Sequence, residues 1–299
     1  MRFRSMGHAL AVDTPAKLNL FLRVIGRRSD GFHDLETVMV AIDLFDTLCF
    51  ATASDDSAYE TTLRIDQTRI GGEQLPTDSR NLIRKAVDLV REHSERSDAV
   101  SIDVTKRIPM QAGLAGGSSN AAATLLALNR IWNLNWSREK LLELGGQLGS
   151  DVNFFLGPTG TALCCGRGEV IQPVPSIANR PVVVVHPPSG LSTAKVFQAC
   201  TPDSTGPSAS DFVTQLEHKP EVAFSSSLQN TLETPAQMLN PDVNHVLSTL
   251  SRESVIGHLM SGSGSSCFAI CRSHRQARTV AARLRARRTG RVFVARTLF

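Results

Sequence analysis

Runs of β-branched and aromatic residues, separated by polar breaks, are typical of the first part of the chain. Residues 18–25 and 37–50 are rich in β-branched and aromatic side chains and end at polar residues, so we expect a strand in each. Residues 100–105 alternate apolar and polar side chains, which predicts a strand with one buried face. The mainly apolar runs at 161–165 and 181–186 are typical of fully buried strands.

The spacing of apolar residues lengthens to that of a helix in several other segments. Residues 81–95 place apolar side chains three and four positions apart. Residues 118–132 are rich in Ala and Leu, and residues 137–148 begin with a serine that suits a helix N-cap. An arginine-rich helix is expected at 274–288, whereas residues 201–210 are rich in Thr, Pro, Ser and Gly and predict a loop.

Three further strands are expected near the C-terminal end, at 255–260, 267–271 and 291–295. Strands and helices are therefore mixed along all 299 residues, which predicts an α+β protein. We expect the two halves of the chain to meet near residues 165–180.

The net charge is too small to indicate a nucleic-acid partner. The 32 Lys and Arg residues exceed the 28 Asp and Glu residues, which gives a charge of +4. No apolar run approaches the roughly 18 residues of a membrane helix, and the basic N-terminus leads into no apolar core of a signal peptide. With 41% hydrophobic residues and a mean hydropathy of −0.07, the composition predicts a soluble cytoplasmic protein without a membrane partner.

The positive charge is concentrated at the C-terminal end. After Glu253 the chain has no acidic residue, while nine arginines lie between Arg272 and Arg296, these two included. Two interpretations are open: the arginines bind an anionic partner, or they form the solvated face of the helix expected at 274–288. Runs of charge on one helix face commonly face water, so we favour the second.

The cysteines are expected to be reduced and buried. They lie at positions 49, 164, 165, 200, 267 and 271. None forms a Cys-x-x-Cys pair, and the adjacent pair at 164 and 165 suits neither a zinc site nor a disulfide framework. Cysteines of this kind are typical of buried thiols in a reducing compartment.

The most informative segment is a glycine-rich stretch that opens the Ala-rich helix. Gly113, Gly116 and Gly117 allow backbone angles that other residues avoid and a close approach of the backbone to a ligand. Ser118 and Ser119 add hydroxyl groups at the start of the helix, where unpaired N–H groups and the positive end of the dipole favour anions. This combination predicts a site for a di- or triphosphate; a glycine-rich turn without a ligand is the alternative.

Two common phosphate motifs do not fit this stretch. A P-loop requires Lys and then Ser or Thr after its last glycine, but Gly117 is followed by Ser118. The dinucleotide pattern Gly-x-Gly-x-x-Gly is absent too, because Gly113 and Gly116 are three residues apart. A second loop, Ser-Gly-Ser-Gly-Ser-Ser at 261–266, lies between two predicted strands. Alone it indicates only a hairpin, but two such loops are able to bracket a polyphosphate from both sides.

Three polar residues in apolar surroundings are candidates for the chemistry. Lys17 and Asn19 lie at the start of an otherwise apolar strand, and Asp151 precedes an apolar Phe-Phe-Leu run. Considered alone, each of these residues is most simply explained as an exposed residue at the end of a strand or helix. Together, a lysine beside an aspartate keeps the carboxylate ionised and oriented, which suits a base that accepts a proton from a hydroxyl group.

Three stretches of the chain resemble the GHMP kinases, in the same order. They are Pro-Ala-Lys-Leu-Asn-Leu-Phe-Leu at 15–22, the glycine-rich loop at 113–123 and Ser-Gly-Ser-Gly-Ser-Ser-Cys-Phe at 261–268. Further matches that narrow the resemblance are Arg-Ser-Asp-Gly-Phe-His-Asp at 28–34, Asn-Leu-Ile at 81–83 and Gly-Ser-Asp-Val-Asn-Phe-Phe at 149–155. Together the matches run from about residue 13 to residue 270, nearly the whole chain.

The resemblance implies a two-domain GHMP kinase fold of the α+β class. An N-terminal domain similar to domain 2 of ribosomal protein S5 would comprise residues 1–173, and a ferredoxin-like C-terminal domain residues 174–299. The resemblance also implies an ATP-dependent kinase for an alcohol group of a small molecule that carries cytidine diphosphate, with Mg²⁺ accompanying ATP. No acidic residue can be assigned as a metal ligand, so Ser118 and Ser119 are the candidates.

The resemblance assigns roles to the matching positions. Lys17 and Asp151 would be the catalytic pair, with Asp151 accepting the proton of the hydroxyl group. The residues near ATP would be Asn81, Lys106, Pro109, Met110, Gln111, Ala112, Gly113, Leu114, Ala115, Gly116, Gly117, Ser118 and Ser119. The substrate would contact Asn19, Phe32, His33, Thr193 and Phe197, with the two phenylalanines on either face of cytosine.

Stacking and hydrogen bonding favour such a cytosine pocket on physical grounds. A flat base gains about 1–3 kcal/mol from each aromatic face on which it stacks, and His33 can present a donor and an acceptor to the base edge. Without the resemblance, His33 would be interpreted as a surface turn residue, and Phe32 and Phe197 as part of the core. The chain departs from the family pattern at Phe32, where Tyr is common, and near Asp151, where Ser150 and Asn153 replace the usual Ala and Pro.

Two alternatives remain open at this point. The first is another GHMP kinase, of the homoserine or mevalonate type, against which the aromatic residues and His33 argue. The second is a non-catalytic protein that binds ATP without turnover, against which Lys17 and Asp151 argue.

Overall fold

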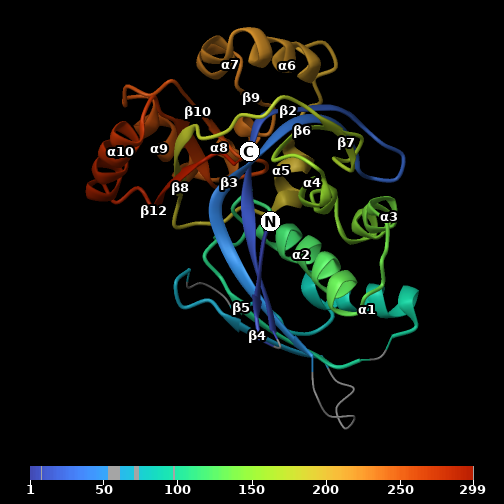
Figure 1. Cartoon of the computed structure of the whole chain (residues 1–299). Coiled ribbons are helices and arrows are strands. Elements are labelled where there is room, and N and C mark those ends of the chain that lie inside the picture. The colour runs from blue at the N-terminus through green and yellow to red at the C-terminus, as the bar shows by residue number, and fades with distance from the viewer. Residues whose placement is uncertain (8, 53–60, 71–73, 97, 299) are drawn as a thin grey trace. The chain divides into compact units, whose positions relative to one another are not determined.

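Two long strands contribute to both structural units of the protein. The computed structural model describes residues 1–7, 9–52, 61–70, 74–96 and 98–298 (Figure 1). Unit 1 comprises Met1–Ala16, Leu44–Pro109 and Ala115–Leu156, and unit 2 comprises Lys17–Asp43, Met110–Leu114 and Gly157–Phe299. Strands β2 (Ala9–Arg27) and β3 (His33–Thr52) each have one part in each unit. Because the units are interleaved along the chain, the domain boundary at residue 173 stays a prediction.

The part of the eight-stranded sheet that contains the strands of unit 1 has the order β1-β2-β3-β5-β4. Its other strands are β1 (Arg2–Met6), β4 (Thr62–Asp66) and β5 (Val100–Thr105). β1 pairs antiparallel with β2, and β5 pairs antiparallel with β3 and parallel with β4. Buried residues alternate with more exposed ones along β5, which confirms the strand with one buried face that the sequence predicts.

The helices described in unit 1 are α1 (Leu82–Ser94), α2 (Gly116–Ile131), α3 (Arg138–Leu148) and α4 (Val152–Leu156). α2 packs against the other three, as Figure 1 shows for α1. Its small residues permit this close approach, since Ala121, Ala122 and Ala123 are fully buried. α2 begins at Gly116 and not at the predicted residue 118, because the N-cap position is taken by Ala115 with a left-handed φ of 53°.

Unit 2 contains an antiparallel sheet with the order β10-β11-β8-β12. Its strands are β8 (Pro181–His186), β10 (Gly257–Met260), β11 (Cys267–Ile270) and β12 (Arg291–Arg296). The four consecutive valines of β8 are all buried, as a central strand with both faces covered requires. Helices α9 (Pro241–Leu250) and α10 (His274–Ala286) share a core with two of these valines.

Unit 2 also contains the remaining parts of β2 and β3. β6 (Thr161–Cys165) pairs with β3, β7 (Val170–Pro173) pairs with β6, and the two-residue β9 (Gln229–Asn230) pairs parallel with β2. The other helices are α5 (Thr193–Ala199), α6 (Ala209–His218), α7 (Pro220–Ser226) and α8 (Glu233–Leu239). α6 begins inside the loop predicted at 201–210, because Ser208 and Asp211 form a capping box that starts a helix there.

The strands expected at 18–25 and 37–50 are confirmed, but β2 and β3 extend beyond both ranges. Polar residues interrupt the apolar pattern at their ends and are nevertheless compatible with the sheet. Asp13 of β2, for example, accepts a hydrogen bond from Oγ1 of Thr47 at 2.8 Å. The short strands β1, β4, β7 and β9 and the five-residue helix α4 are not predicted, because so few residues do not show a period.

The arginine-rich helix is the clearest success of the hydrophobic pattern. In α10 the residues Ala277, Val280, Ala281 and Leu284 are all buried, whereas Arg275 and Arg278 are exposed. This arrangement confirms the predicted buried face of the helix and places these two arginines on its exposed face. No helix in the described ranges, α10 included, is long and apolar enough to cross a membrane.

None of the six cysteines forms a disulfide, as the sequence predicts. Burial is confirmed for Cys164, Cys267 and Cys271, but Cys49, Cys165 and Cys200 are only half-buried, so the prediction of buried thiols is wrong for these three. Burial raises the pKa of Cys271 to about 11, so its thiol stays protonated and unreactive near neutral pH.

Candidate active site

The start of α2 offers hydrogen-bond donors to an anion. The first amides of a helix have no partner within it, and here Gly116, Gly117 and Ser118 supply them. The N-cap residue Ala115 makes no side-chain hydrogen bond to them. The hydroxyl group of Ser119 is buried and has no hydrogen-bond partner within the described part of the chain. These donors, together with the positive end of the helix dipole, fit a phosphate group.

The loop that precedes α2 alternates between two hands of backbone conformation. Gln111, Gly113 and Ala115 have positive φ values of 49°, 70° and 53°, while the residues between them do not. Left-handed conformations are costly at Gln111 and Ala115, which carry a Cβ atom, and such costs are concentrated at binding sites. Where right- and left-handed residues alternate, successive N–H groups turn toward a common centre and attract anions. The positive φ at every second residue is consistent with such a phosphate site.

The second loop, residues 261–266, is hydrogen-bonded to the first. The amide of Ser265 donates to the carbonyl oxygen of Gln111 at 3.3 Å, and the amide of Ser266 donates to that of Ala112 at 3.2 Å. The hydrogen-bonded residues of both loops belong to unit 2. Two segments that are separate signals in the sequence are thus joined by backbone hydrogen bonds.

Gly113 is a point of very close approach between the loops. The Oγ atom of Ser261 donates to the carbonyl oxygen of Gly113 at 3.0 Å. A Cβ atom at Gly113 would collide with the carbonyl oxygen of Ser261 and would lie 3.1 Å from the amide nitrogen of Gly264. The φ of 70° also favours glycine, so both space and conformation exclude other residues at this position.

Lys17 lies inside β2 and its amine is directed to the first loop. The residue is only 3% exposed. Its Nζ atom donates to Oδ1 of Asn19 at 2.5 Å and to the carbonyl oxygen of Gly113 at 3.0 Å. Asn19 is fixed in turn, because its Nδ2 atom donates to Oγ1 of Thr37 at 2.7 Å. The structure therefore brings together Lys17, Asn19 and part of the first loop in unit 2.

Asp151 belongs to unit 1 and lies half-buried directly before α4. Asn153 of α4 is 6% exposed, and its side chain fills the space that Gly145 of α3 leaves by having no Cβ atom. The unusual asparagine is therefore accommodated by a glycine on the neighbouring helix. Because Lys17 belongs to unit 2, its pairing with Asp151 stays a prediction.

Lys106 takes part in a buried charge network. Its amine forms an ion pair with Asp46, and both side chains are almost completely buried. The Asp46 carboxylate also accepts the amide of Arg107 at 2.7 Å and the Nδ2 atom of Asn120 at 3.1 Å. A Cβ atom at Gly116 would lie 3.3 Å from the Lys106 amine. The lysine is thus next to the start of α2, but it already has a carboxylate partner.

Asn81 is the N-cap residue of α1. Its Oδ1 atom accepts the amide of Ile83 at 2.9 Å, and its Nδ2 atom donates to the carbonyl oxygen of Pro76 at 2.7 Å. The side chain of Leu82 lies 3.6 Å from the position of a Cβ atom at Gly117, so the starts of α1 and α2 are neighbours. Helix capping explains the side-chain position of Asn81, and its contact with ATP stays a prediction.

Two of the expected substrate residues meet in unit 2. The ring centroids of His33 and Phe197 lie 5.2 Å apart, with an angle of 35° between the rings. Phe32 is 50% exposed and is not part of the core. The Cζ atom of Arg167 lies 4.8 Å from the centroid of its ring, which is a cation–π contact. An aromatic ring with this exposure is suited to stacking on a flat ligand.

A charged turn presents Phe32 and His33. Arg28 forms ion pairs with Asp30 at 3.1 Å and with Asp34 at 2.9 Å. The Oδ1 atom of Asp30 accepts the amide of Phe32 at 3.1 Å, and this hydrogen bond lowers the pKa of the Asp30 carboxyl group. The carboxylate therefore stays ionised near neutral pH and keeps the turn closed around the aromatic residues.

Thr193 connects α5 to the second loop. Its Oγ1 atom lies 2.9 Å from the Oγ atom of Ser263, within hydrogen-bond distance. Phe197 follows four residues later in the same helix, and residues at this spacing share a helix face. Thr193, Phe197 and the second loop are therefore adjacent.

The described residues contain no group of three or more His, Cys, Asp and Glu side chains that could hold a metal ion. Mg²⁺ keeps several water ligands and usually reaches kinases with the phosphates of the substrate. The buried hydroxyl group of Ser119, for which the structure shows no partner among the residues it describes, fits such an ion or its phosphate. Ser118 lies half-buried at the same helix start.

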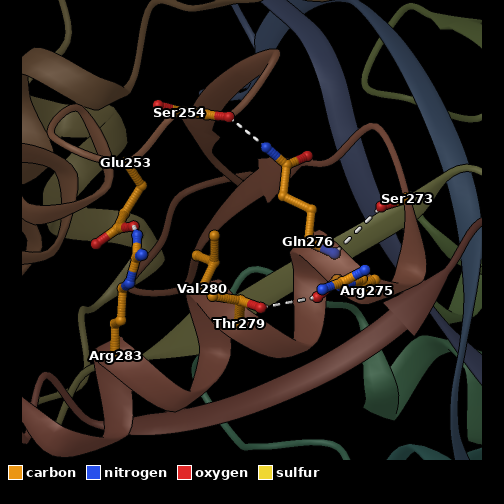
Figure 2. Close-up of a pocket in the computed structure, with 8 residues that line it drawn as sticks. All are labelled: Glu253, Ser254, Ser273, Arg275, Gln276, Thr279, Val280 and Arg283. Atoms are coloured by element: carbon orange, nitrogen blue, oxygen red, sulfur yellow. Dashed lines mark hydrogen bonds and ion pairs between the residues drawn. The ribbon is translucent and has the colours of Figure 1, made fainter.

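A pocket of about 400 Å³ lies beside α10 and involves none of the expected site residues (Figure 2). It is lined by Glu253, Ser254, Ser273, Arg275, Gln276, Thr279, Val280 and Arg283. The Glu253 carboxylate accepts Arg283 at 3.0 Å and Arg287 at 3.1 Å, and Gln276 donates to the carbonyl oxygen of Ser254. Hydrogen bonds and ion pairs between neighbouring groups therefore hold the Glu253 and Gln276 side chains of this pocket in place.

Sequence reasoning missed Asp46 and Arg167. Asp46 is a carboxylate in the mainly apolar strand β3, and a buried charge requires a partner; that signal could have led to Lys106. Arg167 lies between two glycines, and nothing in the sequence connects it to Phe32 because their contact is tertiary.

Two family models match the chain. The model of the GHMP kinases N terminal domain matches residues 81–158, and the model of the GHMP kinases C terminal matches residues 216–288. The first match contains the start of α2 and Asp151, and the second contains the second loop.

Relatives and solved structures resemble nearly the whole chain. A 4-diphosphocytidyl-2-C-methyl-D-erythritol kinase of Shouchella clausii is 38% identical over 261 residues, which are 87% of this chain and 85% of the relative. A solved 4-(cytidine 5'-diphospho)-2C-methyl-D-erythritol kinase is 33% identical with a TM-score of 0.79, over 97% of this chain and 99% of its own. A homoserine kinase from Cytophaga hutchinsonii has a TM-score of 0.73 over 100% of this chain and 98% of its own, but its identity of 20% shows a common fold alone.

Proposed function

The chain belongs to the GHMP kinase family, and we propose that it transfers the γ-phosphoryl group of ATP to the 2-hydroxyl group of 4-diphosphocytidyl-2-C-methyl-D-erythritol. The best support is the 38% identity, over 87% of the chain, with a kinase of that name. The likeness to a solved structure confirms the two-domain GHMP kinase fold. The reaction is a step of the non-mevalonate route to isoprenoid precursors, and we place it in the cytoplasm without nucleic-acid or membrane partners.

In this proposal the first loop holds the phosphates of ATP. The support is the set of amides at Gly116, Gly117 and Ser118, together with the alternating backbone conformation before them. Donors that are already oriented need no reorganisation when negative charge builds up on the transferred group. The second loop is bonded to the first and keeps this backbone in place.

Asp151 and Lys17 act on the acceptor and on the transferred group. The hydroxyl oxygen of the acceptor forms the new O–P bond, the bond between the γ-phosphorus and the bridging oxygen breaks, and ADP leaves. Asp151 accepts the hydroxyl proton. The transition state is loose, so the protein mainly positions groups and balances charge. Lys17 supports the balancing role, because its buried amine is bonded to the first loop at Gly113.

The cytosine ring stacks between Phe32 and Phe197, and His33 bonds to its edge. The half-exposed ring of Phe32 and the proximity of His33 to Phe197 support this assignment. Asn19 and Thr193 contact the rest of the substrate; both are hydrogen-bonded to the second loop. The substrate of a homoserine or mevalonate kinase has no flat base that would stack on such an aromatic pair, so the pair favours a substrate with a cytidine group.

Mg²⁺ enters with ATP and offsets the charge of its phosphates. Ser119 is the residue whose buried hydroxyl group best fits that ion or an adjacent phosphate oxygen, and Ser118 is the second candidate. Asn81 and Lys106 support the nucleotide site from beside the start of α2, through the cap of α1 and the ion pair with Asp46.

The decisive experiment measures ADP release by the purified protein with Mg²⁺ and ATP. The acceptors to compare are 4-diphosphocytidyl-2-C-methyl-D-erythritol, mevalonate, homoserine and none. We expect release only with the cytidine compound, and a new phosphate monoester at its 2-position by phosphorus NMR. Release with another acceptor would remove the cytosine pocket from the proposal. Tight ATP binding without any release would favour the non-catalytic alternative.

Replacement of the proposed base tests the catalytic assignment. We expect Asp151→Asn to lower kcat by about 10²- to 10⁴-fold, because the acceptor loses its base, while ATP binding by calorimetry changes little. The control is Asp103→Asn, since Asp103 lies on β5 with a side chain that is 59% exposed. An Asp151→Asn enzyme with the kcat of the control would refute the role of Asp151.

A further inference from the structure

The second loop is held at its base by two side chains of one short segment. Asn230 is 7% exposed, and its Nδ2 atom donates to the carbonyl oxygens of Met260 and Gly262, both at 2.8 Å. Its Oδ1 atom accepts the amide of Leu232 at 2.9 Å. The carboxylate of Glu233 accepts the amide of Met260 at 2.9 Å. Both N–H hydrogens of the Asn230 side-chain amide are therefore hydrogen-bonded, one to β10 and one to the second loop.

The same segment is anchored to the strand that carries Lys17. Asn230 pairs with Leu22 of β2 in a parallel arrangement. The amide of Thr231 then donates to the carbonyl oxygen of Leu22 at 3.0 Å. One stretch of β2 thus presents Lys17, and a later stretch holds the residue that binds the second loop.

Asn230 fixes Gly262, and Gly262 lies directly against the amine of Lys17. A Cβ atom at Gly262 would lie 3.2 Å from the Nζ atom of Lys17 and 3.3 Å from the Oδ1 atom of Asn19. The φ of Gly262 is 56°, so the backbone is left-handed at the point where it lies beside the amine. A shift of this glycine would change the surroundings of the Lys17 amine immediately.

We infer that Asn230 is a positioning residue for phosphoryl transfer, which acts through Gly262 to keep the amine of Lys17 covered and directed at the first loop. The inference rests on the proposed role of Lys17 in the reaction. A side-chain amide suits this task because it donates two hydrogen bonds in fixed directions, whereas a carboxylate donates none. The bonds are buried, so their loss leaves two carbonyl oxygens without a partner.

The test compares two nearly isosteric exchanges of amide for carboxylate. Asn230→Asp keeps the acceptor for Leu232 and replaces both donors to the loop. The matched control is Asn129→Asp in unit 1, since Asn129 bonds the amide of Trp136 at 3.0 Å and its carbonyl oxygen at 3.3 Å. Both exchanges remove buried or half-buried bonds to the backbone, but only the first concerns the second loop.

The first readout is the rate at which trace amounts of acetic anhydride acetylate Lys17, measured by mass spectrometry without any substrate. Lys17 is 3% exposed in the native protein, and we expect its rate to rise at least about 10-fold in Asn230→Asp as the loop shifts. The second readout is kinetic. We expect kcat to fall by about 10- to 100-fold while KM for both substrates changes by less than about 2-fold, the result of a small misplacement.

Both readouts are made at a temperature where circular dichroism shows each variant to be fully folded. A purely structural role would lower the unfolding temperature of both variants and leave acetylation and kcat as in the native protein, and this outcome overturns the inference. If Asn230→Asp does not fold, Asn230→Ser keeps one donor, and we expect intermediate effects. Failure of the native protein to phosphorylate the acceptor rejects the proposed function alone, because acetylation still decides whether Asn230 controls Lys17.

Discussion

The two glycine-rich loops are similar in composition, but they differ in how their backbone groups are hydrogen-bonded. The first, residues 109–119, leads into a helix whose first amides have no partner within the helix. The second, residues 261–266, uses its backbone groups on the first loop and on Asn230. The difference fits the proposal that the first loop binds phosphate, while the hydrogen bonds of the second loop maintain the shape of the first.

A division of this kind has a physical reason. A binding loop must keep donors available for its ligand, yet unpaired donors do not hold a backbone in one conformation. Left-handed residues such as Gln111 and Ala115 persist only where the surroundings enforce them. The second loop supplies that enforcement through Ser265 and Ser266, and it is itself held by side chains from β9 and α8.

Substitution of Gly113 should have the largest effect on stability and activity, because it disrupts the close contact between the two loops. In Gly113→Ala the new Cβ atom meets the carbonyl oxygen of Ser261, and the φ of 70° is costly for alanine. We expect the free energy of unfolding to fall by about 2–4 kcal/mol and kcat/KM for ATP by more than about 100-fold. Denaturant titration and steady-state kinetics measure these changes.

The matched control for this substitution is Gly26→Ala in β2. A Cβ atom at Gly26 has no heavy atom within 4 Å, so we expect little change in stability or kinetics. If both variants behave alike, the loops are not joined as described.

Acid should destabilise the protein through an anchor of the second loop. His186 is hydrogen-bonded to Ser266 at 3.2 Å, and burial, together with the charge of Arg291, lowers the pKa of His186 to about 4. The unfolded chain binds a proton near pH 6.5, but the folded chain does not until about pH 4. The contribution of His186 to stability is therefore complete above pH 6.5 and is lost as pH falls toward 4, by about 3 kcal/mol at most.

Unfolding by urea at several pH values checks this expectation, with His186→Gln as the comparison. Glutamine does not titrate, so the variant should show a shallower loss of stability between pH 6.5 and pH 4. Parallel curves for the two proteins would mean that other groups cause the acid sensitivity.

Substitution of Gly117 should separate binding from stability. A Cβ atom there lies 3.6 Å from the side chain of Leu82, an ordinary contact, and the φ is not left-handed. Gly117→Ala should keep the unfolding free energy or raise it by about 0.5–1 kcal/mol, since alanine favours a helix. KM for ATP should rise about 10-fold, because the methyl group crowds the open amides of the binding loop. An unchanged KM would place the phosphates elsewhere.

The hydrophobic pattern predicted the elements that are long and show a single period. The spacing in α10 identified its buried face residue by residue, and the valine run of β8 marked a central strand. The ends of β2 and β3 were missed, because polar residues there are satisfied by partners across the sheet. Phe32 would be interpreted as core from its residue type, yet it is half exposed and lies beside Arg167.

Residue type and spacing along the chain were enough to suggest the proposed chemistry, through a glycine-rich loop with serines at a helix start, a second glycine-serine loop, and a lysine and an aspartate that suit proton and phosphoryl transfer. These features are local, and glycine spacing and residue type suffice to express them. The folded structure was needed to show that Lys106 is already paired with Asp46, that Asn81 caps a helix, and that Asn230 holds the second loop. Such assignments depend on partners distant in sequence, and the hydrogen bonds that fix them form only when the chain is folded.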